Sequence, residues 1–204
     1  MNKYSVIPSD EVINDVIEKL KENGFNPILV DTKEQALEKI KELLPKGSEF
    51  LAGSSISLNE IGFGDYMKEN GGDYKNVSDI IRSENDETKR GDLRRKAATT
   101  DYMLGSVGAI TQDGYLIAVD ATGSRVGSYL FAAKNLIIVA GANKIVQDIN
   151  DGMKRIREYV YPLEDKRLMG MYNVHSSTAK WIIFEREKTP ERVHVILVKE
   201  ALGF

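Results

Sequence analysis

The chain has 204 residues, no cysteine and a formal net charge of -3, from 28 basic and 31 acidic side chains. Without cysteine it can hold no disulfide, thiolate zinc cluster or cysteine-ligated iron–sulfur centre. The near balance of charges argues against a nucleic-acid partner, and no apolar run approaches the ~20 residues that a membrane span needs. Hydrophobic residues make up 42% of the chain, so we expect a substantial core. Because the first residues lack the apolar stretch of a secretory signal, we expect a cytoplasmic protein.

Helices and short strands alternate in the first half of the chain. Apolar residues at helical spacing predict a helix that begins after Ser9 as its N-cap and stops at Gly24. Thr32 and Gln35 form the capping box of a second helix. The further predictions are strands at 26–30 and 49–52, a helix from near residue 57 to before residue 71, an edge strand at 74–77 and an exposed helix at 85–98.

The second half continues this alternation and ends in β-structure. Asp113 and Gly114 join two strand-like runs, which predicts a hairpin. The predicted elements are strands at 102–111 and 115–119, a small-residue helix from 120 through 129, a buried strand at 136–140, a helix over 145–156, and strands at 181–184 and 193–198. This order predicts one α/β domain over residues 1–204, with a mostly parallel sheet flanked by helices and a β-rich C-terminal end.

The predicted helix at 85–98 is strongly basic. Its cations are Arg90, Arg94, Arg95 and Lys96, and its apolar positions are few. Such a cluster is more often a solvated face than a binding patch, and we expect the former here.

Three loops leave a predicted strand at the edge where open α/β sheets bind ligands. The first contains Gly53, Ser54 and Ser55 and leads into a helix. Its hydroxyls and backbone N–H groups can hold a phosphate or a carboxylate. The same serines are also ordinary helix caps, so both interpretations stay open.

The second loop begins with Asp120, which can accept a hydrogen bond from a substrate hydroxyl or act as a general base. Thr122 adds a hydroxyl, Gly123 lets a ligand approach the backbone, and Arg125 can pair with an anionic group. The alternative is structural, with Asp120 capping a helix and pairing with Arg125.

The third loop carries Lys144, which we expect to reach the same crevice. None of the three loops matches the phosphate loop of nucleotide triphosphatases or the dinucleotide fingerprint. Of the two histidines, His175 lies in a loop where a general base is conceivable, whereas His194 alternates with apolar residues in a strand and favours packing. The histidine and cysteine counts predict no metal site, and no cofactor is identified.

Five runs taken in order resemble the LUD domain of lactate utilization proteins. They are GSSISLNEIG at 53–62, AITQDGYL at 109–116, DATGSRV at 120–126, VAGANKIV at 139–146 and VILVKEALGF at 195–204. The resemblance implies a fold related to ribose-5-phosphate isomerase and the CoA transferases. It also implies a small anionic metabolite as ligand and a part in oxidising lactate to pyruvate beside iron–sulfur redox partners. Many relatives carry a cysteine-rich stretch where this chain has residues 171–179 without cysteine.

Other functions remain open at this point. A stand-alone isomerase or acyl-transferase-type enzyme would act on a sugar phosphate, a CoA thioester or a folate derivative. It would use Asp120 or Glu60 as base and Arg125 and Lys144 to hold the anion. A pure interaction module would use none of these residues. The sequence is compatible with a monomer and with a homo-oligomer.

Overall fold

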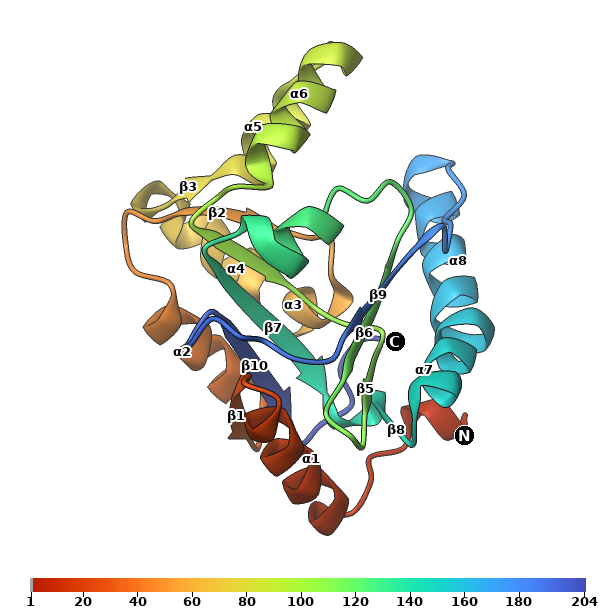
Figure 1. The fold of residues 1–204 in the computed structure, drawn as a ribbon. Coiled ribbons are helices and arrows are strands. Elements are labelled where there is room, and N and C mark those ends of the chain that lie inside the picture. The colour runs from red at the N-terminus through yellow and green to blue at the C-terminus, as the bar shows by residue number, and fades with distance from the viewer. Residues whose placement is uncertain (1) are drawn as a thin grey trace.

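The fold is organised around a six-stranded parallel sheet (Figure 1). The protein is described by a computed structural model that covers residues 2–204. In spatial order the strands are β1 (Asn26–Val30), β10 (Val193–Val198), β7 (Asn135–Gly141), β4 (Tyr102–Gly105), β2 (Glu49–Ala52) and β3 (Lys75–Asn76). Every neighbouring pair is parallel, so all the carboxyl ends lie at one edge of the sheet.

A second, smaller sheet packs against the first. Its order is β8 (Ile145–Val146), β5 (Ala109–Thr111), β6 (Leu116–Asp120) and β9 (Lys180–Phe184). The predicted hairpin is confirmed, because β5 and β6 are antiparallel and Gly114 takes a φ of 78° in the turn between them. Strands β5 and β6 lie in the chain between β4 and β7, and β8 and β9 between β7 and β10. The small sheet therefore lies in the connections between parallel strands of the main sheet.

Helices cover the remaining faces. They are α1 (Asp10–Glu22), α2 (Lys33–Leu43), α3 (Ile56–Glu60), α4 (Phe63–Asn70), α5 (Val77–Ser83), α6 (Glu87–Ala97), α7 (Ile149–Arg155) and α8 (Tyr161–Tyr172). Short turns complete the list: η1 (Lys3–Ser5), η2 (Gly71–Asp73), η3 (Ser128–Ala132), η4 (Ala142–Lys144) and η5 (Ile156–Val160). Helices α5 and α6 project from the body at the top of Figure 1, and α7, η5 and α8 follow one another without a break.

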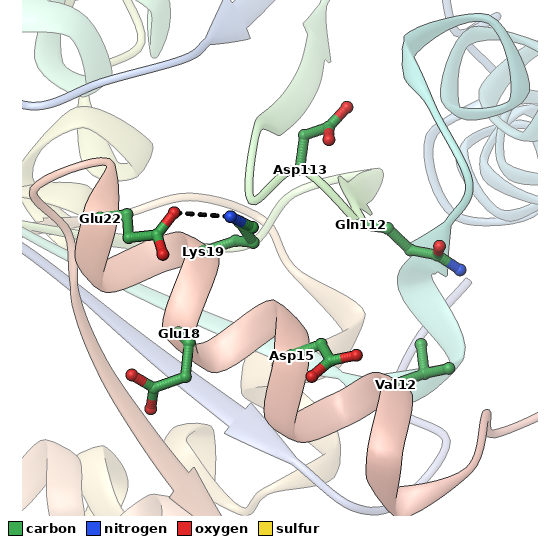
Figure 2. A pocket seen from close by; sticks show the side chains of 7 residues that line it. All are labelled: Val12, Asp15, Glu18, Lys19, Glu22, Gln112 and Asp113. Atoms are coloured by element: carbon green, nitrogen blue, oxygen red, sulfur yellow. Dashed lines mark hydrogen bonds and ion pairs between the residues drawn. The ribbon is translucent and has the colours of Figure 1, made fainter.

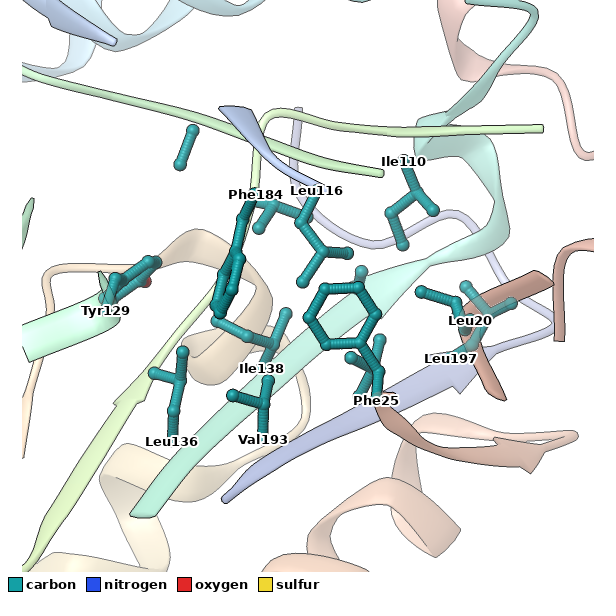
Figure 3. Close-up of a cluster of buried hydrophobic side chains, with 14 of the residues drawn as sticks. Leu20, Phe25, Ile110, Leu116, Tyr129, Leu136, Ile138, Phe184, Val193 and Leu197 are labelled. Atoms are coloured by element: carbon teal, nitrogen blue, oxygen red, sulfur yellow. The ribbon is translucent and has the colours of Figure 1, made fainter. Parts of the chain in front are cut away.

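Strand alternation divides the core into layers. In β7, Leu136 and Ile138 join the cluster between the two sheets, whereas Ile137 and Val139 face the layer formed by α2, α3 and α4. Figure 3 shows the cluster between the sheets, where the Phe25 and Phe184 rings meet edge to face at 5.1 Å. A third, smaller cluster packs α7 and η5 on the outer face of the second sheet.

Several sequence predictions are confirmed by these elements. Ser9 caps α1 by accepting from the Val12 N–H, and Thr32 and Gln35 form both hydrogen bonds of the capping box of α2. The strands at 26–30 and 49–52 have the predicted bounds, and the two C-terminal runs are strands. No helix within residues 2–204 is long and apolar enough to cross a bilayer.

Other predictions were wrong in detail. The helix expected from residue 57 to 70 is split into α3 and α4 at Gly62, whose φ is 81°. The run at 102–111 is two strands of different sheets, and Ile145 belongs to β8 rather than to a helix. The helix expected from Asp120 is delayed to η3 because Asp120 binds its own loop, and α5 was missed.

The central strand gives a direct test of the layered core. Ile138 is fully buried between the sheets, so Ile138→Ala is expected to lower the free energy of unfolding by about 2–5 kcal/mol through lost burial and a cavity. Urea denaturation measures this change. The control is Ile183→Ala in β9, where the side chain is exposed and the cost is expected to stay below about 1 kcal/mol. Equal effects at the two positions would contradict the layer assignment.

Candidate functional site

A cleft of about 970 Å³ opens at the carboxyl edge of the main sheet. Its walls come from both sheets: the loops after β2 and β4 on one side, and the loop after β6 on the other. Residues of α5, α6 and α8 line its outer parts. The position fits the rule that ligands of open α/β sheets bind beyond the carboxyl ends of the strands.

A smaller hollow of about 450 Å³ lies elsewhere, between α1 and the β5–β6 turn (Figure 2). Its charged lining is mainly acidic, and Lys19, its one cationic lining residue, pairs with Glu22 at 2.7 Å. None of the predicted site residues lines it. The larger cleft is therefore the candidate site.

The structure brings most of the predicted site residues together in this cleft. Those that line it are Gly53, Ser54, Ser55, Asp120, Thr122, Arg125 and Lys144. Two do not line it. Gly123 has a φ of 87° and lies against the Lys180 side chain, and Glu60 accepts a hydrogen bond from the Gly203 N–H at 2.6 Å. The predicted roles of all these residues in catalysis or binding stay predictions.

Asp120 organises the loop that follows β6. Its side chain is 7% exposed, and Oδ1 accepts from the N–H groups of Thr122 at 2.9 Å and Gly123 at 2.7 Å. Oδ2 accepts from Arg125 Nε at 2.8 Å. Burial on its own raises the pKa of Asp120, but Arg125 and the two N–H groups outweigh it and the pKa is lowered. A charged carboxylate therefore holds this loop in shape.

Arg125 is fixed by the same loop and is presented to the cleft. Its Nη2 donates to the Val119 carbonyl at 2.8 Å, and its guanidinium lies 5.9 Å from the centre of the Tyr129 ring. Its stem packs on Gly53, where a Cβ would lie 3.1 Å from Arg125 Cδ. Within residues 2–204 no acceptor bonds Nη1, and the side chain is 29% exposed. The guanidinium is therefore oriented with donor capacity left for a ligand.

Tyr129 extends this framework to the end of β4. Its hydroxyl accepts from the Ser106 N–H at 3.1 Å and donates to the Ser106 carbonyl at 3.0 Å. A Cβ on Gly105 would lie 1.9 Å from the Tyr129 hydroxyl oxygen, so no larger residue fits there without displacing Tyr129. These contacts fix the backbone of Ser106 at the floor of the cleft.

Lys144 lies in η4, directly after β7, and is 3% exposed. Its Nζ is 3.0 Å from Ser57 Oγ, 3.0 Å from Ser106 Oγ and 3.2 Å from the Val107 carbonyl. Burial, together with the positive charge of Arg155, lowers the pKa of Lys144 to about 7, and Glu60 offsets this only in part. Because β7, β4 and β2 are neighbours in the sheet, the segments that follow them bring Lys144, Ser106 and Ser57 together.

The sequence model of the LUD domain matches residues 13–198. The chain belongs to the LUD domain family. Its fold is similar to that of a DUF162 family protein from Deinococcus radiodurans, with 15% identity and a TM-score of 0.55 over 94% of this chain and 99% of the other. It is also compared with eIF2B beta from Chaetomium thermophilum, with 10% identity over 69% and 48% of the chains, but the TM-score of 0.39 supports no argument. No curated protein matches the chain.

The cleft of this LUD domain is positively charged although the chain as a whole carries a net charge of -3. The cationic lining residues are Lys68, Arg82, Arg94, Arg125, Lys144 and Arg167, and the acidic ones are Asp79, Asp120 and Glu164. Each of these acids pairs with an arginine of the same lining. Of the three cations that remain, Lys68 pairs with Asp65 outside the lining at 2.7 Å, and the pKa of Lys144 is lowered to about 7. The excess of positive charge in the cleft therefore rests mainly on Arg94, which has no ion-pair partner within residues 2–204.

Sequence reasoning missed part of this LUD site. Arg94 was expected on a solvated face, yet it lines the cleft, and Ser106 and Tyr129 were not singled out. The two histidines lie apart from it. His175 is exposed beside Asp165 at 3.1 Å, and burial lowers the pKa of His194, which lies in a central strand. No His, Asp or Glu cluster that could hold a metal occurs within residues 2–204.

The pH dependence of stability tests the role of Asp120 in this LUD domain. Its pKa is lowered in the folded state, so its stabilising contribution is present above the unfolded value of about 3.9 and is lost as pH falls through the folded value. Asp120→Asn is expected to lower the free energy of unfolding at pH 7 by about 1–3 kcal/mol, and the difference should shrink below about pH 4.

The control for this prediction is Asp113→Asn in the exposed β5–β6 turn, which should change stability little at either pH. Urea denaturation at several pH values measures the free energy of unfolding of each variant and its dependence on pH. If Asp120→Asn is as stable as the wild type at pH 7, the role assigned to this carboxylate is wrong.

Lys144 gives a second pH dependence of stability, with the same sign as that of Asp120 but at higher pH. Its folded pKa of about 7 lies below the ordinary value of 10.5, so between these values the unfolded chain binds more protons and stability rises with pH. The rise is expected to reach at most about 1 kcal/mol per pH unit and to disappear in Lys144→Met. The charged groups that act on Lys144 are Arg155 and Glu60.

Denaturation between pH 7 and pH 9 measures this slope. Lys134→Met, on an exposed lysine, should keep the wild-type slope. If Lys144→Met also keeps it, Lys144 titrates normally and the assignment fails.

Proposed function

We propose that this LUD domain binds a small organic anion in the cleft and assists the oxidation of lactate to pyruvate together with redox partner proteins in the cytoplasm. The observation that supports it is the pair of arginines in the cleft lining: Arg125 is held in place by Asp120, and Arg94 has no ion-pair partner within residues 2–204. Oriented cations in a concave, partly desolvated site attract carboxylates and phosphates more strongly than exposed ones do.

The chemistry of lactate suits the groups on the cleft wall. A carboxylate is matched by Arg125 Nη1, which no acceptor within residues 2–204 bonds, and a neighbouring hydroxyl is matched by Thr122 or Ser54, which line the same cleft. The cleft is near the upper end of the ~300–1,000 Å³ common for ligand sites, so it also has room for a larger anion. A sugar phosphate or a CoA thioester therefore belongs in the same binding test.

Oxidation of lactate to pyruvate releases two electrons and two protons. This sequence has no cysteine, so it supplies no thiolate for an iron–sulfur cluster and no thiol couple for the electrons. The electrons must pass to a bound cofactor or to a partner that carries the cluster. The contribution proposed for this chain is to hold and orient the anion.

Isothermal titration tests this binding. We expect heat on addition of L-lactate or pyruvate, none with the neutral analogue lactamide, and weaker binding at high salt, because ion pairing with the cleft cations carries the interaction. Arg94→Gln should reduce affinity about fivefold, which corresponds to about 1 kcal/mol for a partly exposed charge.

The matched control is Arg95→Gln on the same helix. Arg95 pairs with Asp92 and does not line the cleft, so affinity should stay unchanged. The panel also contains ribose 5-phosphate and acetyl-CoA. Absence of binding by every anion of the panel, or equal loss in both variants, would contradict the proposed function.

A further inference from the structure

The contacts around Lys144 allow an arrangement in which its neutral amine accepts a proton from a serine hydroxyl. The Val107 carbonyl, 3.2 Å from Nζ, can only accept. Ser57 Oγ is placed to donate to the Leu202 carbonyl at 3.4 Å, and so it accepts from Nζ. A neutral amine has two N–H groups and one lone pair. Ser106 Oγ also lies 3.3 Å from Ser57 Oγ and 3.5 Å from the Val107 carbonyl, but Lys144 Nζ is nearer, at 3.0 Å. When the two N–H groups of the neutral amine bond Val107 and Ser57, the lone pair is left to accept the proton of Ser106 Oγ.

The two serines differ in access. Ser57 is 1% exposed and is enclosed by the C-terminal segment, where a Cβ on Gly203 would lie 2.7 Å from Ser57 Oγ. Ser106 is only half-buried and lines the cleft, while its backbone is fixed on both sides by the Tyr129 hydroxyl. Ser106 is therefore the hydroxyl that a ligand in the cleft can reach, and Lys144 lies behind it.

We propose that Ser106 is a nucleophile and Lys144 its general base, in an acyl-transfer site whose substrates are esters or thioesters of small anionic acids. This goes beyond the proposed anion binding, since it requires a covalent step at Ser106 and assigns Lys144 to proton transfer. The juxtaposition of a buried lysine with a positioned, accessible serine is the pattern of an activated nucleophile. The positive cleft favours substrates that carry a negative group.

The proposed reaction balances in two steps. In the first, Ser106 Oγ attacks the acyl carbon while its proton passes to Lys144 Nζ. The bond to the alcohol or thiol leaving group breaks, and that group takes the proton from Lys144. In the second, water attacks the acyl-serine, its proton passes to Lys144, and the proton returns to Ser106 Oγ as the acid leaves. Water is the only co-reactant.

The surroundings of Lys144 favour the free amine that this role requires. Arg155 from α7 is fully buried, and its positive charge disfavours a second cation nearby. Glu60 from α3 acts in the opposite direction, but it is engaged by the Gly203 N–H. The pKa of Lys144, lowered to about 7, is close to the value at which a general base works best at neutral pH.

A serine-directed fluorophosphonate tests the proposal on the intact chain. We expect a single covalent adduct on Ser106, located by peptide mass spectrometry, whose rate of formation rises with pH and levels off above about 7. Ser106→Ala should give no adduct. Lys144→Met should label about 100-fold more slowly, because general-base assistance is lost.

The control is Ser83→Ala in α5, whose hydroxyl donates to the Ile80 carbonyl outside the cleft, and its labelling should match the wild type. Circular dichroism establishes that each variant is folded. If Lys144→Met does not fold, Lys144→Arg replaces it, since a permanent cation cannot accept the proton.

The proposal is overturned by a folded wild type that forms no adduct, by an adduct on another residue, or by a folded Lys144 variant that labels as fast as the wild type. An adduct on Ser106 in a protein that binds none of the tested anions would refute only the proposed function. Anion binding without an adduct would refute only the serine–lysine site.

Discussion

A buried arginine and a buried lysine hold the place where the chain passes from the main sheet to the second sheet. Arg155 donates to the carbonyls of Gly108, Tyr4 and Asn143, and Lys144 donates to that of Val107. Within residues 2–204 neither forms an ion pair, so carbonyl dipoles and aromatic faces replace a carboxylate, with the Arg155 guanidinium 5.4 Å from one tyrosine ring. A buried charge stabilised in this way is sensitive to geometry, and it ties the N-terminal turn, the crossing segment and the site into one unit.

The opposite wall of the cleft depends on an ion pair between Asp120 and Arg125. There both carboxylate oxygens of Asp120 accept hydrogen bonds, one from the N–H groups of its own loop and the other from Arg125. These bonds fix the orientation of the guanidinium. Tyr129 then connects this wall to Ser106 through a pair of hydrogen bonds. Anion binding and serine chemistry would thus share one hydrogen-bonded framework. This framework already holds Arg125 and Ser106 in place before a ligand binds.

Local signals predicted much of the fold, and long-range contacts explain the rest. Neighbouring residues are enough to indicate the capping box of α2 and the Asp113–Gly114 turn, although Asn23 also donates to the Asp113 carbonyl. The break between β4 and β5 at residues 106–108 depends on contacts with Tyr129 and Arg155, which lie far along the chain. The local pattern therefore predicted one strand over 102–111. For the candidate site, the sequence singled out loops that line the cleft, but not that Gly123 lies against Lys180 or that Ser106 reaches the cleft.

The small sheet is built from the connections of the large one, and the cleft is the seam between them. A molecule large enough to span this seam would contact the loops after β2 and β4 and the loop after β6 at the same time. Its binding free energy is therefore added to the cohesion between the layers, which otherwise rests on apolar packing and a few buried polar contacts. A ligand that spans the cleft is therefore expected to raise the stability of the whole domain and not only to order the loops that it contacts.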